Sequence, residues 1–232
     1  MSSPYFITHL ETDILLDPSQ MTNGIRENIE QNLLTRHNKK CFYNYGYIDS
    51  ILEIDEKIKG GVIRAEDNTA SSVHRVKFKC RICNPIKNKK IVATIVGINN
   101  VIIIARNGPI TFIIDSNNIN SDKIKYQKSA YYPIASNGDI IDKPIKDGTY
   151  VIVEVMNKKI VNGRNEIISI AKLDSAIPEN EIENAIKNRY IGRDIEANEL
   201  LKLGEEEEIE DNSESFESES DDESEHQLDS DE

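Results

Sequence analysis

Apolar and polar residues alternate along the first part of the chain with the two-residue period of a β-strand. The segment YFITHLETDILL at residues 5–16 follows this period imperfectly and predicts an opening strand. The turn-forming residues Asp17-Pro18-Ser19 then end it. Residues 19–40 change to a four-residue period, which predicts an amphipathic helix of about four or five turns. The apolar residues that set this period are Met21, Ile25, Ile29 and Leu33.

Strand-forming segments follow the helix and complete a first domain. The segment CFYNYGYIDSILEI at residues 41–54 is rich in aromatic and β-branched residues and is interrupted at Gly46. Gly60-Gly61 predicts a turn or bulge, after which residues 62–83 continue into a long strand. One strand, one helix and several further strands predict an α+β domain over residues 1–84.

Shorter strands separated by turn signals begin after Asn84-Pro85. Three apolar segments, KKIVATIVGI, NNVIIIA and ITFIID, precede a long polar stretch at residues 116–148, and RNGP forms a turn before the third. Two more segments follow, TYVIVEVMNKKIV and EIISIAKL, joined by Asn162-Gly163. Five strands with one long insertion between the third and fourth predict an OB-type β-barrel over residues 85–177.

The C-terminal part of the chain contains two further segments. Pro178 and the glutamates that follow it predict the start of a helical extension over residues 178–204. Its apolar face would consist of Ile182, Ile186 and Tyr190. Residues 205–232 contain 16 acidic residues, no Lys or Arg and few apolar residues, so we expect a disordered acidic tail.

The net charge of −13 is distributed unevenly along the chain. Without the acidic tail the chain has 28 basic and 25 acidic residues, and residues 73–128 alone have 11 basic and 2 acidic ones. A strongly basic middle suits a nucleic acid or an acidic protein as partner, and it is also typical of a solubilising surface.

The stretch RVKFKCRIC at residues 75–83 lies in this basic region and contains a possible metal motif. Cys80 and Cys83 have the spacing of a metal knuckle, but tetrahedral zinc needs four ligands and no second pair exists. On an extended strand these two side chains also point to opposite faces, so we expect neither a metal site nor a redox role. A total of three cysteines is typical of a reducing intracellular compartment.

Four basic residues of the same stretch share one face of the predicted strand. The basic stripe, as we call it below, consists of Arg75, Lys77, Lys79 and Arg81. The alternate residues, which would be buried, are Val76, Phe78, Cys80 and Ile82. Because like charges along one strand repel, the stripe is either solvated, bound to a polyanion or an acidic protein, or used in some other way.

Basic and aromatic residues of the barrel are candidates for binding single-stranded nucleic acid. Barrels of this type stack bases on aromatic rings and contact phosphates with Lys and Arg. The candidates are Lys87, Lys89, Lys90, Arg106, Phe112, Lys123, Lys125, Tyr126, Lys128, Tyr131 and Tyr132. The alternative is that Phe112 lies in the core and the tyrosines close the barrel. An aromatic content of 6% predicts weak, sequence-tolerant binding.

Sequence motifs for catalysis are not found. The chain has no nucleophile elbow, P-loop or dinucleotide-binding fingerprint, and its four histidines are scattered. We therefore expect a non-catalytic protein without a cofactor.

The order of these segments resembles that of a known family. Residues 5–177 resemble the seventh subunit of eukaryotic RNA polymerase II and its archaeal counterpart, the larger of the two proteins that form the polymerase stalk. The segments that carry the resemblance are DILLDPSQM, CFYNYGYIDSILEI, KGGVIRAEDNTASSVHRVKFK, NKKIVATIV, NGPITFII, TYVIVEV and EIISIAKL. The resemblance implies a tip domain that docks on the polymerase core near the clamp, and an OB domain that contacts emerging RNA.

The resemblance also implies contact residues and partners. The loops that would face the polymerase core are Asp17-Pro18-Ser19 and Gly60-Gly61-Val62-Ile63. The basic residues and tyrosines of the barrel would face RNA. The implied partners are the large and small polymerase subunits and weakly bound nascent single-stranded RNA, while a smaller stalk partner cannot be inferred from this chain. The helix after residue 178 and the acidic tail extend beyond the usual end of the family.

We therefore predict a non-catalytic stalk subunit of a multisubunit RNA polymerase. The alternatives are an OB-fold translation or exosome-type factor and a nuclease. The acidic tail would contact basic polymerase partners or shield the barrel from unspecific nucleic acid, with Ser218 and Ser220 as phosphorylation candidates. No membrane span is predicted. The compartment would be the nucleus for a cellular protein, and a cytoplasmic factory or the virion for a large DNA virus.

Overall fold

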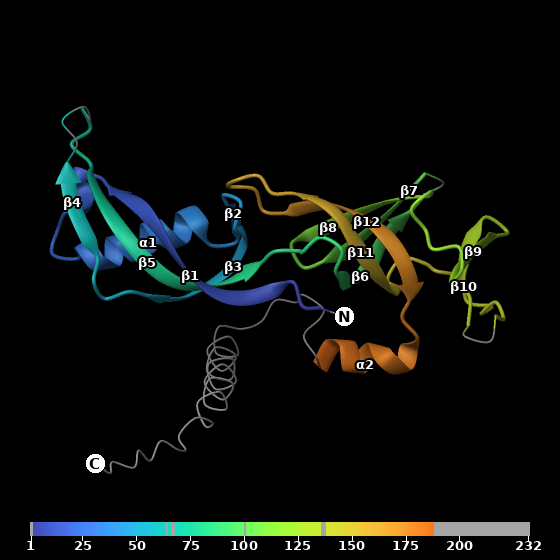
Figure 1. Cartoon of the computed structure of the whole chain (residues 1–232). Helices are drawn as coiled ribbons and strands as arrows, with labels where there is room; N and C mark the ends of the chain where they lie inside the picture. Colours follow the sequence, from blue (N-terminus) through green and yellow to red (C-terminus); the bar gives the residue numbers. More distant parts are fainter. Residues whose placement is uncertain (1, 64, 66–67, 100, 136–137, 188–232) are drawn as a thin grey trace, which may run out of the picture. The chain divides into compact units, whose positions relative to one another are not determined.

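The computed structural model describes residues 2–63, 65, 68–99, 101–135 and 138–187 (Figure 1). The helices and strands, in chain order, are β1 (Tyr5–Leu16), the 3₁₀ helix η1 (Pro18–Gln20), α1 (Ile25–His37), β2 (Lys40–Phe42), β3 (Gly46–Ile54), β4 (Lys59–Ile63), β5 (Ser72–Cys83), β6 (Lys90–Ile98), β7 (Ile102–Asn107), β8 (Ile110–Asp115), β9 (Ile124–Gln127), β10 (Ala130–Pro133), β11 (Tyr150–Lys159), β12 (Ile167–Ala176) and α2 (Glu179–Lys187). They form a five-stranded N-terminal sheet, a closed barrel and the two-stranded β9–β10 hairpin, which confirms the predicted α+β class.

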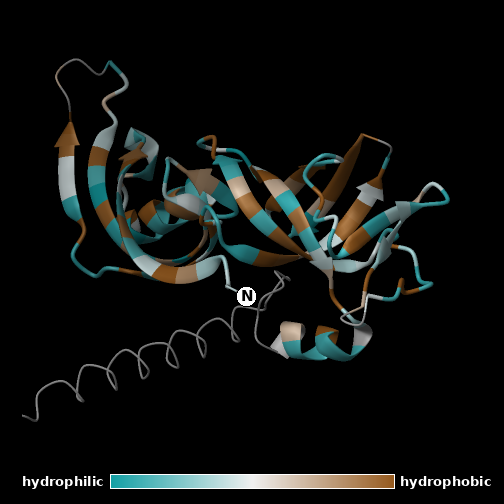
Figure 2. Cartoon of the chain, turned by 45° about the vertical axis from the view of Figure 1, so that its right-hand side comes forward, coloured by the Kyte–Doolittle hydropathy of each residue, from teal (hydrophilic) through white to brown (hydrophobic). Residues whose placement is uncertain are grey.

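The N-terminal sheet is built around β5. On one side β5 pairs with β1 along its whole length, from Cys83 opposite Tyr5 to Ser72 opposite Leu16. On its other side β5 pairs first with β3 and then with β4. Alternate residues of β1 and β5 are apolar, as the striped colouring in Figure 2 shows, and they are buried beneath α1. The predicted burial of Val76, Phe78, Cys80 and Ile82 is confirmed.

Helix α1 begins later than the sequence predicts. Residues 18–20 form η1, and the Asn28 side-chain amide donates a hydrogen bond to the Gln20 carbonyl oxygen at 2.8 Å, which fixes a turn before the helix. The predicted helix start near residue 19 is therefore wrong, and Ile25 is exposed at the first turn. The four-residue period continues instead through Ile29 and Leu33 to His37, all of which are buried.

Two predicted strands of the N-terminal sheet are each divided. The interruption at Gly46 is a hairpin between β2 and β3. Gly46 has φ of 141°, and a Cβ there would lie 2.5 Å from the Cys83 carbonyl oxygen, so the position requires glycine. The predicted long strand over residues 62–83 is wrong, since β4 ends at Ile63 and β5 begins at Ser72. The predicted bulge at Gly60-Gly61 is confirmed by a register shift between Gly60 and Val62.

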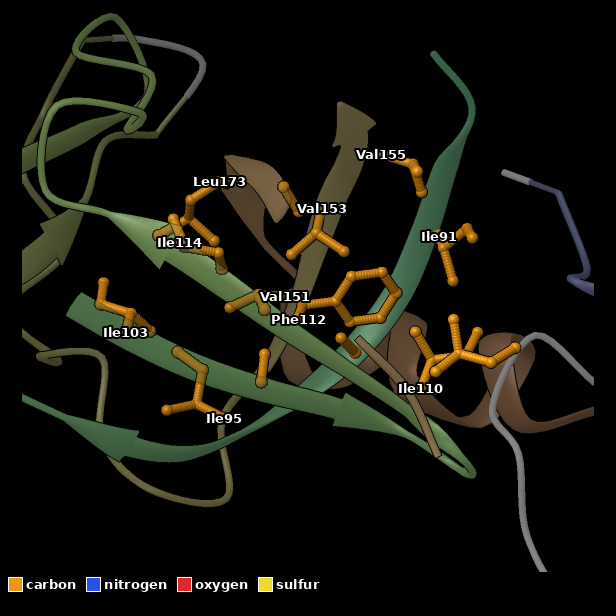
Figure 3. Close-up of a cluster of buried hydrophobic side chains, with 14 of the residues drawn as sticks. Ile91, Ile95, Ile103, Ile110, Phe112, Ile114, Val151, Val153, Val155 and Leu173 are labelled. Atoms are coloured by element: carbon orange, nitrogen blue, oxygen red, sulfur yellow. The ribbon is translucent and has the colours of Figure 1, made fainter. Parts of the chain in front are cut away.

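The barrel closes in the order β6–β7–β8–β12–β11, with β11 pairing back to β6. All neighbouring strands are antiparallel except β8 and β12, which are parallel, and this confirms the predicted OB-type barrel. Phe112 lies at the centre of the core among the side chains of Val151, Val153 and Ile110 (Figure 3). The interpretation of Phe112 as a core residue is therefore confirmed, and its ring is not available to stack on a base.

The insertion between β8 and β11 contains the β9–β10 hairpin, which the sequence analysis missed. Lys128 and Ser129 form its two-residue turn with φ of 48° and 61°, a conformation usually signalled by Asn or Gly. The start of the insertion is held to the barrel by a bridge between Ile119 and Leu173. The Asn120 backbone N–H also donates to the Leu173 carbonyl oxygen at 2.9 Å.

Helix α2 confirms the predicted helix start after Pro178. Its residues Ile182 and Ala185 pack with Val92 and Ile177 in a small apolar cluster beside the barrel. The side chain of Ile186, all of Tyr190 and the predicted acidic tail at 205–232 lie outside the described residues.

Candidate functional site

Two segments predicted to face the polymerase core meet at one end of the N-terminal sheet. In the sheet register, Ser72 lies opposite both Leu16, which precedes Asp17-Pro18-Ser19, and Ile63, the last residue of β4. The Ser71 hydroxyl donates a hydrogen bond to Asp17 Oδ1 at 3.2 Å. Segments that are distant in the sequence therefore form one surface, which we call the sheet end.

Apolar side chains are exposed at the sheet end. Leu15 and Val62 both lie opposite Val73, so the three form a row across β1, β5 and β4 on the face opposite α1. Leu15 is 47% exposed, Val62 63% and Ile63 56%, and the end of β4 is coloured as hydrophobic in Figure 2. Neighbouring exposed apolar side chains of this size are typical of a protein-binding surface.

The basic stripe continues this sheet face but is compensated by acids of the same chain. The Arg75 guanidinium Nε lies 3.1 Å from Asp13 Oδ1 and 3.6 Å from Glu11 Oε1. Lys77 lies opposite Glu11 in β1, and Lys79 lies opposite Glu53 in β3. Carboxylates of β1 and β3 therefore lie beside these three residues, a source of counter-charge within the chain that differs from the predicted solvent, polyanion or acidic protein.

Arg81 differs from the rest of the stripe because it is buried. Its guanidinium lies 4.6 Å from the centroid of the Tyr5 ring and 3.7 Å from Asp49 Oδ2, and its side chain is only 10% exposed. The stripe thus shares one face, as predicted, but Arg81 is neither solvated nor open to a partner. Tyr5 and Asp49, on β1 and β3, account for the difference.

Cys80 and Cys83 point into different hydrophobic clusters. Cys80 is buried beneath α1, whereas Cys83 is buried with Cys41, Tyr47 and residues of the barrel. Burial raises the pKa of the Cys80 thiol to about 12 and raises that of Cys83 strongly as well. Both are therefore protonated small hydrophobic residues at neutral pH. Among the described residues, no group of three or more His, Cys, Asp or Glu residues could hold a metal ion.

Two of the predicted RNA-binding lysines converge on Asp174 in β12. Lys90 Nζ lies 2.9 Å and Lys123 Nζ 3.2 Å from Asp174 Oδ2, and the Asn120 amide donates to Oδ1 at 3.3 Å. Partial burial acts to raise the pKa of Asp174, but the hydrogen bonds from these three groups outweigh it and lower the pKa. This cluster ties the insertion to the barrel, and its lysines already have a counter-charge.

The β9–β10 hairpin carries one exposed aromatic ring and two exposed lysines. Tyr126 is 54% exposed and its ring lies 4.9 Å from that of Tyr131, measured between centroids. Tyr131 is 8% exposed and belongs to the barrel cluster, so it supports Tyr126 from below. Lys125 and Lys128 flank Tyr126 and are exposed. Of the predicted residues, these three are exposed together on the hairpin, with Lys125 and Tyr126, as neighbours in β9, pointing to opposite faces.

The other predicted residues lie elsewhere on the barrel. Lys87 and Lys89 are exposed on the segment before β6. This segment is held to β11 by a hydrogen bond from the Asn88 N–H to the Val155 carbonyl oxygen. Arg106 lies near the far end of β7, beside the β7–β8 turn. The structure thus distributes the predicted RNA-binding residues over several sites.

The outer face of β7, β8 and β12 is aliphatic, which the sequence analysis did not identify. Ile113 lies opposite Ile104 on one side and Ile170 on the other, and Ile170 is exposed. This is the face on which OB barrels usually hold oligonucleotides. With isoleucines in place of aromatic rings, this row has no surface on which bases can stack.

Similar proteins are found among RNA polymerase subunits. A protein of Acanthamoeba polyphaga mimivirus named as a DNA-directed RNA polymerase subunit is 33% identical over 189 residues, which is 78% of this chain and 88% of the relative. RNA polymerase II subunit rpb7 of Schizosaccharomyces pombe is 23% identical over 172 residues, covering 73% of this chain and 95% of the relative. The chain belongs to the RNA polymerase subunit 7 family.

Membership of the subunit 7 family confirms the resemblance seen in the sequence. The corresponding subunit of Dictyostelium discoideum is 27% identical over 126 residues, covering 54% of this chain and 72% of the relative. No protein-family model matches the chain. In the part of this subunit 7 homologue that the structure describes, no helix has the length and apolar character to cross a membrane.

Proposed function

We propose that this subunit 7 homologue is a non-catalytic stalk subunit of a multisubunit RNA polymerase. The N-terminal sheet would anchor the subunit to the polymerase core near the clamp, and the barrel would contact nascent RNA. The observation that carries this proposal is the sheet end, where two segments implied by the family resemblance meet beside exposed apolar residues.

The sheet end has the chemistry of a protein-binding surface. Leu15, Val62 and Ile63 are large apolar residues exposed at one place, and burying them against another protein would be favourable. The bulge at Gly60-Gly61 supports the shape of this surface: a Cβ on Gly60 would lie 2.5 Å from the Val73 carbonyl oxygen, so only glycine fits. The partners would be the large and small subunits of the polymerase. A smaller stalk subunit would be a further partner.

The β9–β10 hairpin supports the proposed contact with RNA. Tyr126 offers one ring for stacking, and the exposed Lys128 in the adjoining turn and Lys125 on the other face of β9 would contact phosphates. Lys87 and Lys89 add positive charge elsewhere on the barrel. One exposed ring and a few lysines favour weak binding that tolerates any sequence and weakens with salt. The names of the relatives support this role over that of a translation or exosome-type factor.

Affinity purification of the tagged full-length chain tests the anchoring role. From the source cells or infected cells, the wild-type chain should co-purify with the large polymerase subunits. The double substitution Val62→Asp and Ile63→Asp should reduce their recovery at least tenfold, because two carboxylates would have to be buried. Ile170→Asp, at an exposed isoleucine of the barrel, is the matched control and should leave recovery unchanged. Co-purification with ribosomes instead of polymerase would overturn the proposal.

A further inference from the structure

A pocket of about 450 Å³ lies where the β7–β8 turn meets the loop between β11 and β12. Arg106 enters it from β7 and Arg164 from the β11–β12 loop, and Thr111, Asn165 and Glu166 complete its polar lining. In OB barrels, strands two and three and the loop between strands four and five form the general ligand-binding region. The corresponding elements here are β7, β8 and the loop that carries Arg164.

Backbone hydrogen bonds fix the positions of both arginines. Arg106 is part of β7 and lies opposite Thr111 in β8. The Arg164 carbonyl oxygen accepts a hydrogen bond from the Cys41 N–H at 2.7 Å, and the Gly163 N–H donates to the Cys41 carbonyl oxygen at 2.8 Å. Both arginines are therefore carried by ordered backbone, so ligand binding has to order only their side chains.

The charged groups of the pocket differ in whether they have a side-chain partner. In the part of the chain that the structure describes, neither guanidinium has an ion pair or a side-chain hydrogen bond. Glu166, in contrast, accepts a hydrogen bond from the Thr111 hydroxyl at 3.1 Å. Two guanidinium groups and one carboxylate leave a net charge of about +1, which one singly charged anion would balance.

We infer that Arg106 and Arg164 bind one phosphodiester group of single-stranded RNA. The inference rests on the proposed contact between the barrel and RNA and adds a site to it. The planar guanidinium group matches a phosphate in a bidentate arrangement. A phosphodiester carries one negative charge and balances the pocket, whereas a nucleoside triphosphate or a phosphorylated side chain carries further charges that the pocket would leave uncompensated. By lowering the positive charge of the pocket, Glu166 weakens the binding of highly charged phosphates more than that of the internal phosphates of an RNA chain.

The pocket and the β9–β10 hairpin are separate contacts for the same RNA. Thr111 in the pocket and Asp115, where the insertion begins, are about 13 Å apart along β8. The hairpin lies beyond Asp115, so one RNA chain would have to cross the barrel to reach both sites. Two linked weak contacts bind more tightly than either alone, because the second forms within one complex.

Titration of the full 232-residue chain with a fluorescent uridine-rich RNA lacking terminal phosphates tests the inference. The double substitution Arg106→Ala and Arg164→Ala should weaken binding about tenfold at low salt. It should also reduce the slope of log K against log salt by about 0.7, since the contact with one phosphate of a single strand is lost. Arg26→Ala with Arg36→Ala, which removes the same charge from the surface of α1, is the matched control and should change neither value.

The outcomes separate this inference from the proposed function. If the wild-type chain binds RNA and the pocket variant behaves like the α1 control, the pocket assignment is wrong and RNA contact by the barrel stands. If the wild-type chain does not bind RNA, the RNA contact in the proposed function is wrong, and the pocket assignment with it. Competition by UTP should be weak for the wild type and stronger after Glu166→Gln. Strong competition by UTP at the wild-type pocket would instead identify a nucleotide site and overturn the phosphodiester assignment.

Discussion

The N-terminal sheet and the barrel differ in how far their basic residues are compensated by carboxylates of the same chain. On the sheet, Arg75, Lys77 and Lys79 lie beside carboxylates of neighbouring strands, which turns a basic strand into a mixed-charge face. On the barrel, Lys125 and Lys128 of the hairpin are exposed, and Arg106 and Arg164 share a pocket with a single carboxylate. The number of charges in a segment therefore says little about binding, since strand register decides which charges remain available.

Arg81 offers the largest test of how the sheet uses its charges. Arg81→Ala should lower the free energy of unfolding by about 1–2 kcal/mol, because Tyr5 would lose its packing and Asp49 would keep only Lys39 as a partner among the described residues. Arg75→Ala, on the exposed part of the stripe, should leave the free energy of unfolding nearly unchanged, because ion pairs between exposed groups contribute little. Urea unfolding of both variants measures the difference, and equal values would show that burial does not divide the stripe.

His37 should make the N-terminal sheet more sensitive to acid than the barrel. Burial, with help from Arg36 and Lys40, lowers the pKa of His37 to about 4, and its Nε2 has no hydrogen-bond partner among the described residues. Its contribution to stability is complete above the ordinary pKa of about 6.5 and is lost as the pH falls from there towards 4. Between pH 7 and pH 5 the sheet should lose about 1–2 kcal/mol.

Hydrogen exchange at both pH values can follow the two regions separately. After correction for intrinsic exchange, protection should fall in β1 and β5 and stay nearly constant in β8 and β12. His37→Phe should remove the pH dependence of the sheet. If protection falls as much in the barrel as in the sheet, groups other than His37 cause the acid effect.

On the barrel, Asp174 compensates the charges of two lysines, as the carboxylates of β1 and β3 do on the sheet. Asp174→Asn should cost about 1 kcal/mol of stability, because charge-assisted hydrogen bonds become neutral ones. It should also release Lys90 and Lys123, so that RNA binds about two- to threefold more tightly. The stabilisation by wild-type Asp174 is present above its unfolded pKa and is lost as the pH falls through its lowered folded pKa. Unchanged RNA affinity would show that these lysines do not contribute when released.

Neutralising acidic residues on the sheet should leave its basic residues uncompensated, like those of the barrel. Glu11→Gln with Asp13→Asn would leave Arg75 and Lys77 without their neighbouring carboxylates. We expect a small gain in unspecific RNA binding, about twofold at low salt and lost at high salt. The control is Glu27→Gln with Glu30→Gln on α1, which changes the net charge equally away from the stripe. A gain of the same size in the control would attribute the effect to net charge alone.

Local features of the fold could be predicted from the sequence where one residue type decides the geometry. The bulge at Gly60-Gly61, the alternation along β5 and the barrel strands follow from glycine conformations and two-residue periods. The β9–β10 hairpin could not be predicted, because Lys128-Ser129 adopt a turn conformation that their side chains do not favour. Helix α1 was extended too far because a four-residue apolar period continues through the turn before it.

The candidate sites depended on contacts that a single segment does not reveal. Burial of Arg81 requires Tyr5 and Asp49 from two other strands. Arg164 was not predicted at all, because its proximity to Arg106 arises from the parallel pairing of β8 and β12. The residues of the sheet end were named through family resemblance, and their meeting at Ser71 and Ser72 needed the sheet register.

Strand β5 has a mechanical consequence. It begins at Ser72 beside the sheet end, and its last residue, Cys83, is buried in a cluster that includes barrel residues. Along its whole length of about 36 Å it is hydrogen-bonded to β1, so the pair resists stretching far more than a loop would. If the sheet end is held by a large partner, strain applied to the barrel by a moving polymer would travel along β1 and β5 as tension. The same two strands would then transmit that tension to the sheet end, where the partner is bound.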